Sequence, residues 1–135
     1  MTDAELAAIL TRARTVAVVG LSPKPHRPSH GVARYLQRAG YRIVAVNPGH
    51  AEILGEPSYA TLRDAAAGTR LDIVNVFRRS AFAGGVVAEA IPLRPDLIFL
   101  QLGVVDPDAA AAAQAAGIPF VMDRCLAVEH QRLVT

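Results

Sequence analysis

The segment that follows the first apolar run of the sequence has the residue types of a phosphate-binding loop. It contains Gly20, Ser22, Pro23, Lys24, Pro25, Arg27 and Ser29. Ser29 is a suitable N-cap for a helix, and the free N–H groups of a helix start attract anions. The alternative is a rigid connecting loop with solvated charges. Lys24 is the only lysine of the chain, and the loop exceeds the roughly 2 to 6 residues usual for such a connection. Both facts favour a binding loop.

Two further segments with binding chemistry come directly after apolar runs. Phe77 and Arg78 follow one run, and Gln101, Leu102 and Gly103 follow another. The planar guanidinium of Arg78 can hold a phosphate through its fork of donors, and Gly103 lets a ligand lie against the backbone. The alternative for Arg78 and its neighbour Arg79 is a pair of solvated surface arginines.

Catalytic chemistry has no clear set of residues. Cys125 is the only cysteine, and a nucleophilic cysteine needs a base within hydrogen-bond reach. His130 comes five positions later, which is about 140 degrees around a helix over 126–132. It therefore points elsewhere, and we expect Cys125 to be a packed or structural residue. No paired carboxylates suggest acid–base chemistry, so we expect a protein that is not an enzyme.

The histidines do not predict a metal site. They are His26, His30, His50 and His130, and they lack the spacing on one helix and the accompanying acid that a metal would need. The single cysteine excludes a thiolate zinc site and an internal disulfide, which is typical of a reducing compartment.

Five short apolar runs predict the strands that position these segments. They are nearly continuous in Val, Ile, Leu and Phe, as strands buried on both faces are. The runs are 16–20, 42–46, 71–77, 96–102 and 118–122. Segments with helical spacing of apolar residues separate them. This alternation predicts an α/β protein with a Rossmann-like doubly wound fold, in which helices cover both faces of a five-stranded parallel sheet.

Capping residues predict where several helices begin and end. Thr2 and Thr61 each have an acid three positions later, as in a capping box. Asp106 followed by Pro107 opens an alanine-rich helix that Gly117 closes. Since ligands of open α/β sheets bind at the carboxyl ends of the strands, the loops described above should meet in one crevice.

The sequence departs from the dinucleotide fingerprint. That pattern needs glycines where this chain has Ser22 and Pro25. The second predicted strand ends in Asn47 and Pro48 instead of the acid that binds a ribose hydroxyl of NAD. Both departures weaken an NAD site. An NAD(P)-type nucleotide-binding oxidoreductase subunit stays the alternative function, because the fold hosts many activities.

Composition limits the class of protein. The 135 residues correspond to a single domain over 1–135, with 52% hydrophobic residues and a net charge of +2. No apolar run reaches the roughly 18 to 20 residues of a membrane span, and the first residues lack a signal-peptide pattern. We therefore expect a cytoplasmic location. The dispersed charge also predicts that neither nucleic acid nor a membrane is a partner.

Four ordered motifs resemble the CoA-binding family of small stand-alone proteins, which is similar to the amino-terminal domain of the succinyl-CoA synthetase alpha subunit. The motifs are 16–20 with Ser22 and Pro23, then 46–49, then 101–103, then 122–125. The resemblance implies a Rossmann-like fold with coenzyme A across the strand ends. It implies phosphates near Ser22, Pro23, Lys24 and Pro25, the adenosine near Asn47 and Pro48, and the pantetheine arm along Phe77, Arg78 and the turn 101–103.

The chain differs from the synthetases at two points. They carry a lysine at about the position of His50, where an unperturbed histidine is mostly neutral. The synthetase domain with the phosphorylated histidine has no counterpart in the sequence, so ligase activity is not expected. The sequence thus predicts a non-catalytic or regulatory module that binds coenzyme A or an acyl-CoA. A structural or interaction protein without a ligand is a further alternative, and a poorly formed cleft beside a large exposed apolar patch would favour it.

Overall fold

The fold is an α/β sandwich, seen in a computed structural model that describes residues 1–134. Its helices are α1 (Asp3–Arg12), α2 (Pro28–Arg38), α3 (Leu62–Ala66), α4 (Ser80–Ala90), α5 (Pro107–Ala115) and α6 (Leu126–Val134), with a 3₁₀ turn η1 (Ile91–Leu93). Its strands are β1 (Thr15–Val19), β2 (Arg42–Val46), β3 (Glu52–Ile53), β4 (Glu56–Tyr59), β5 (Ile73–Val76), β6 (Leu97–Gln101) and β7 (Phe120–Arg124).

The seven strands form a single sheet in the order β3-β4-β2-β1-β5-β6-β7. All neighbours are parallel except β3, which pairs antiparallel with β4. Without β3, this is the strand order of a Rossmann sheet, and the order reverses between β1 and β5. The prediction of a Rossmann-like α/β fold is confirmed, but the prediction of five strands is wrong.

The two strands that the sequence analysis missed form the hairpin of β3 and β4. Their turn consists of Leu54 and Gly55, both with positive φ (56° and 75°), which is the geometry of a tight hairpin turn. Neither strand has an alternating apolar pattern, and Pro57 lies inside β4. The hairpin extends the sheet beyond β2, and Pro57 is tolerated because β4 pairs with β2 only from Ser58 onward.

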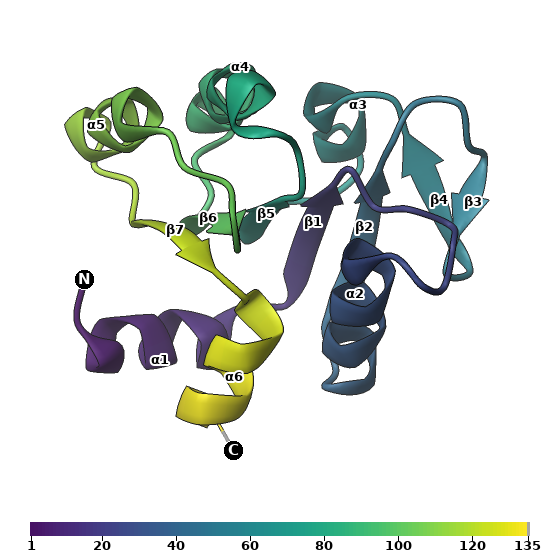
Figure 1. Cartoon of the computed structure of the whole chain (residues 1–135), viewed down its shortest axis with the longest axis horizontal. Coiled ribbons are helices and arrows are strands. Elements are labelled where there is room, and N and C mark those ends of the chain that lie inside the picture. Colours follow the sequence, from purple (N-terminus) through teal and green to yellow (C-terminus); the bar gives the residue numbers. More distant parts are fainter. Residues whose placement is uncertain (135) are drawn as a thin grey trace.

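Helices cover both faces of the sheet, as predicted. Helices α1, α2 and α6 lie on one face and α3, α4 and α5 on the other (Figure 1). The residues of β1 alternate between the two faces: Val16 and Val18 belong to the first core, and Ala17 and Val19 to the second. Since all of β1 is buried, its continuous apolar run is explained by two cores instead of one.

Capping was predicted well at three helices and wrongly at one. The side chains of Thr2, Thr61 and Asp106 each accept a hydrogen bond from the backbone N–H three residues later. Ser29 is not the N-cap of α2: Arg27 occupies that position without a side-chain cap, and Pro28 starts the helix. Proline at the first position removes one N–H that would need a partner. This frees the Ser29 hydroxyl for another role. No helix within residues 1–134 is long and apolar enough to span a membrane.

Candidate functional site

A large cavity opens at the carboxyl ends of the central strands. Its volume is about 1070 Å³, at the upper end of the roughly 300 to 1,000 Å³ typical of small-molecule sites. Val19 pairs in register with Val46 of β2 and with Val76 of β5. The three strands therefore end level, and the residues that follow them meet at the point where the strand order reverses.

Most of the predicted site residues line this cavity. They are Gly20, Ser22, Pro23, Lys24, Arg27, Ser29, Asn47, His50, Phe77, Arg78, Gln101 and Leu102. The exceptions are Pro25, Pro48 and Gly103. Pro25 and Pro48 are exposed and are not among the residues that line the cavity. The backbone N–H of Gly103 donates to Asp123 Oδ1 at 2.8 Å, so this glycine ties β6 to the end of β7 and is not part of the cavity lining.

Gly20 makes the level strand ends possible. Its φ is +88°, and a Cβ atom here would lie 2.4 Å from the carbonyl oxygen of Phe77. The Gly20 N–H donates to the Val46 carbonyl, and the Phe77 N–H donates to the Val19 carbonyl, both at 2.8 Å. Only glycine combines this backbone conformation with such a close approach.

Two serines hold the loop between β1 and α2 in shape. Ser29 Oγ accepts a hydrogen bond from the Ser22 N–H at 3.0 Å, and Ser22 Oγ accepts one from the Lys24 N–H at 3.1 Å. The Arg27 N–H donates to the Lys24 carbonyl at 3.1 Å. Ser29 thus acts within the loop, although sequence reasoning placed it at the helix cap. The loop is fixed before any ligand enters.

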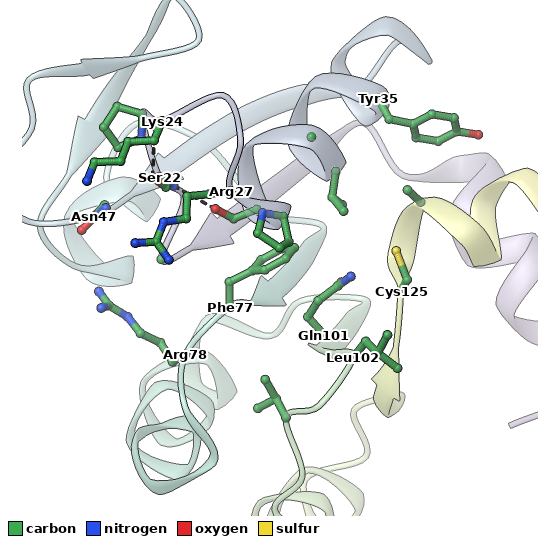
Figure 2. A pocket seen from close by; sticks show the side chains of 18 of the residues that line it. Ser22, Lys24, Arg27, Tyr35, Asn47, Phe77, Arg78, Gln101, Leu102 and Cys125 are labelled. Carbon is green, nitrogen blue, oxygen red and sulfur yellow. Dashed lines mark hydrogen bonds between the residues drawn. The ribbon is translucent and has the colours of Figure 1, made fainter.

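Within the described residues, the cations of the cavity have no carboxylate partner. Lys24, Arg27 and Arg78 make no ion pair within residues 1–134. No aspartate or glutamate of the described chain lines the cavity. Figure 2 shows these three cationic side chains gathered on the side of Asn47. This arrangement favours an anion with several charges.

Asn47 connects the end of β2 to the loop. Its Nδ2 atom donates to the Leu21 carbonyl at 2.8 Å, and its own carbonyl accepts from Ser58 Oγ at 3.0 Å. The side chain therefore stabilises the loop after β1. An aspartate has no donor for the Leu21 carbonyl, so it would break this contact.

A buried amide pair lies beneath the other half of the cavity. Gln101 Oε1 accepts from the Leu126 N–H and from Asn75 Nδ2, both at 3.3 Å. The backbone N–H is always a donor, so it fixes the orientation of the Gln101 amide. That orientation in turn makes Asn75 a donor and leaves Asn75 Oδ1 as a buried atom without a partner among residues 1–134.

Several lining residues were missed by sequence reasoning. They are Pro28, Gly31, Val32, Tyr35, Val104, Cys125 and Ala127. Cys125 follows β7 directly, so the rule that ligands lie at strand ends would have found it. Val32 and Tyr35 have the spacing of a core face of α2, but both are only half-buried and border the cavity. Their helical spacing does not distinguish a core face from a cavity wall.

His130 belongs to an aromatic cluster and not to the cavity. Its Nδ1 atom is 2.9 Å from the Tyr35 hydroxyl, and its ring packs edge-on against Tyr35 and Tyr41. Burial in this cluster lowers the pKa of His130. The His130 ring is therefore engaged with these two tyrosines. No group of residues suited to hold a metal ion is found within residues 1–134.

Comparison with known proteins gives consistent matches over nearly the whole chain. The model of a family described as CoA binding domain matches residues 14–131. The uncharacterized protein YneT of Bacillus subtilis is 39% identical over 127 residues, which is 94% of this chain and 93% of YneT.

Solved structures of similar proteins share the fold closely. The cell-free ID.343 structure from Thermus thermophilus has a TM-score of 0.92 and 44% identity, and the match covers 98% of this chain and 99% of that chain. A hypothetical protein from Pyrococcus horikoshii OT3 has a TM-score of 0.94 and 32% identity over 100% of this chain and 94% of its own.

Proposed function

This chain belongs to the CoA binding domain family, and from that premise we propose that it binds coenzyme A or an acyl-CoA in the strand-end cavity. The observation that carries the proposal is the charge of this cavity: Lys24, Arg27 and Arg78 line it without any carboxylate of the described chain. Coenzyme A carries a diphosphate and a ribose 3'-phosphate. Such a ligand supplies the anions that the three cations lack.

The loop between β1 and α2 is the proposed site of the diphosphate. Its shape is already fixed by the hydrogen bonds of Ser22 and Ser29, so little ordering is needed on binding. Lys24 and Arg27 are exposed at its rim, and the N-terminus of α2 adds its positive dipole end.

The two ends of the ligand are assigned by chemistry. The adenosine and its 3'-phosphate are placed beside Asn47 and His50, next to the cations. The pantetheine arm extends past Phe77 toward Gln101 and Leu102, where the cavity wall is mostly apolar. An arm with two amides suits an apolar channel with a few polar groups.

A non-catalytic or regulatory binding role fits the absence of an acid–base pair among the described residues that line the cavity. Among the described residues that line the cavity, Cys125 is the one cysteine and His50 the one histidine. NAD is the weaker ligand because Asn47 follows β2 at the position where an NAD site has the acid that binds a ribose hydroxyl.

Titration calorimetry with coenzyme A, under reducing conditions, tests the proposal. We expect saturable heat with a dissociation constant below millimolar and a smaller response to NAD at equal concentration. A folded sample that gives no saturable heat with coenzyme A would refute the proposal. Tighter binding of NAD would support the oxidoreductase alternative.

A further inference from the structure

Cys125 lies where the proposed ligand would end. It occupies the junction between β7 and α6, where its carbonyl accepts the Glu129 N–H at 3.0 Å. The residue is half-buried, and it lines the same cavity as the phosphate loop. In Figure 2 the sulfur lies across Phe77 from the three cations. A long ligand with phosphates at one end therefore reaches Cys125 with its other end.

Gln101 supplies an independent sign that a ligand occupies this half of the cavity. The residue is 6% exposed, and its Oε1 atom is used by Leu126 and Asn75. Its Nε2 amino group has no partner within residues 1–134 and points into the space between Phe77 and Cys125 (Figure 2). Because Nε2 is not among the fully buried unpartnered atoms of the described chain, it is open to the cavity, where a carbonyl of the ligand would accept its hydrogen bond.

The Gln101 amino group and the Cys125 thiol lie at the same end of the cavity. The Leu126 N–H that holds Gln101 belongs to the residue after Cys125. Tyr35 also lines this end (Figure 2). Within the described chain it contains no acid and no cation. It suits a neutral arm whose last group is a thiol.

We propose that Cys125 forms a reversible mixed disulfide with the thiol of coenzyme A bound in this cavity, an inference that rests on the proposed function. The Sγ atom of Cys125, as thiolate, attacks one sulfur of coenzyme A disulfide. The bond between the two coenzyme A sulfurs breaks, one coenzyme A leaves as thiolate and takes up a proton, and the other stays joined to Cys125. The incoming disulfide is the oxidant, and its second half is reduced.

Exchange rates measured on the full chain test this inference. The reduced protein is mixed with coenzyme A disulfide or, separately, with glutathione disulfide, and the adduct is followed by intact mass. We expect coenzyme A disulfide to react at least about tenfold faster, because binding positions its sulfur next to Cys125. Desulfo-coenzyme A, which lacks the thiol, should slow this reaction by occupying the cavity.

Two arginine variants test whether the cavity positions coenzyme A disulfide next to Cys125 or whether the thiol is merely accessible. Arg78→Ala should slow the reaction with coenzyme A disulfide and leave that with glutathione disulfide unchanged. Arg42→Ala is the matched control, because Arg42 is exposed at the opposite end of β2, and both rates should stay as in the wild type.

The outcomes distinguish this inference from the proposed function. If reduced coenzyme A binds in calorimetry but both disulfides react at the same rate, Cys125 is only an accessible thiol, and the inference is wrong while the proposed function stands. If coenzyme A disulfide reacts no faster than glutathione disulfide and reduced coenzyme A also fails to bind, the inference and the proposed function are both wrong. Faster reaction with coenzyme A disulfide that desulfo-coenzyme A suppresses supports the inference.

Discussion

The two ends of the sheet use their charged residues in opposite ways. At the carboxyl ends, Lys24, Arg27 and Arg78 face a cavity without a carboxylate of the described chain. At the amino ends, Arg70 bonds Asp72 at 2.5 Å, Asp96 at 3.1 Å and the Arg94 carbonyl at 2.9 Å. Arginine is thus satisfied inside the protein at one end and left for an outside anion at the other.

At the amino ends of the strands, charged side chains join neighbouring segments of the chain. Asp72 Oδ2 accepts the N–H groups of Arg14 and Thr15 at 2.8 and 3.0 Å, at the point where β1 begins. Arg94 reaches the Ala116 carbonyl at 2.7 Å. The sheet therefore has a structural end, and we call the opposite end the binding end according to the proposed function. Changes at the first should alter stability, and changes at the second should alter affinity.

The largest effect is expected where the binding end depends on backbone shape. Gly20→Ala places a methyl group against the Phe77 carbonyl and strains a residue with φ of +88°. We expect a loss of about 3 kcal/mol or more in the free energy of unfolding, measured by urea denaturation. Gly117→Ala is the control: it has φ of +73° and no atom within 4 Å of the added Cβ. Its loss should be about 1 kcal/mol. Equal losses would show that the close approach does not matter.

Removal of one cation should change affinity and leave stability unaltered. Lys24→Ala and Arg27→Ala should each weaken coenzyme A about tenfold, because a charge-assisted bond at an exposed site contributes modestly. The affinity of the wild type should also fall as salt rises. Calorimetry gives the affinities, and thermal melting checks that the fold is unchanged. Unchanged affinity in both variants would assign the phosphates to Arg78 and to backbone donors.

Asn47 tests where the ribose 3'-phosphate lies. Asn47→Asp and Asn47→Ala both lose the hydrogen bond to the Leu21 carbonyl, but only the aspartate adds an anion. If the phosphate is near, the aspartate variant should bind coenzyme A about tenfold more weakly than the alanine variant, which is about 1.4 kcal/mol. NAD binding should not show this difference. Equal affinities of the two variants would place the 3'-phosphate elsewhere.

The smallest effect concerns the structural end and depends on pH. Burial raises the pKa of Asp72, but hydrogen bonds from Arg14, Thr15 and Arg70 outweigh it and hold the pKa below its ordinary value of 3.8. A depressed pKa stabilises the fold above pH 3.8, and this stability is lost as the pH falls through the pKa of the folded state.

Asp72→Asn should therefore cost about 1 kcal/mol at neutral pH. It should also make the free energy of unfolding less sensitive to acid. Urea unfolding measured from roughly pH 2.5 to 7 checks this, because aspartate carboxylates titrate within that range. Coenzyme A affinity should not change. If the free energy of unfolding of the variant falls with pH as steeply as that of the wild type, the proposed role of Asp72 is wrong.

The sequence predicts features that depend on local patterns. Continuous apolar runs indicated the central strands, and an acid three residues after Thr2 or Thr61 indicated helix starts. The hairpin was missed because its turn, Leu54 and Gly55, lacks the usual asparagine or aspartate. The last strand begins at Phe120, two residues later than predicted, since Pro119 contributes only its carbonyl to the ladder.

The candidate site was predictable where it follows strands in the sequence. Gly20, Asn47 and Phe77 come directly after β1, β2 and β5, and register alone brings them together. The wall formed by Val32 and Tyr35 depends on how far α2 stands from α6, which no local pattern encodes. The network of Gln101 with Asn75 likewise depends on neighbouring strands and the start of α6.

An amide-resolved NMR titration with coenzyme A tests the contrast between the two ends most directly. The account predicts the largest shifts within 20–29, at Asn47, at Phe77 and around Gln101 and Cys125, while the amides of Arg70, Asp72 and Asp96 stay in place. Largest shifts at those amino-end residues, or a spectrum unchanged at millimolar coenzyme A, would contradict the account.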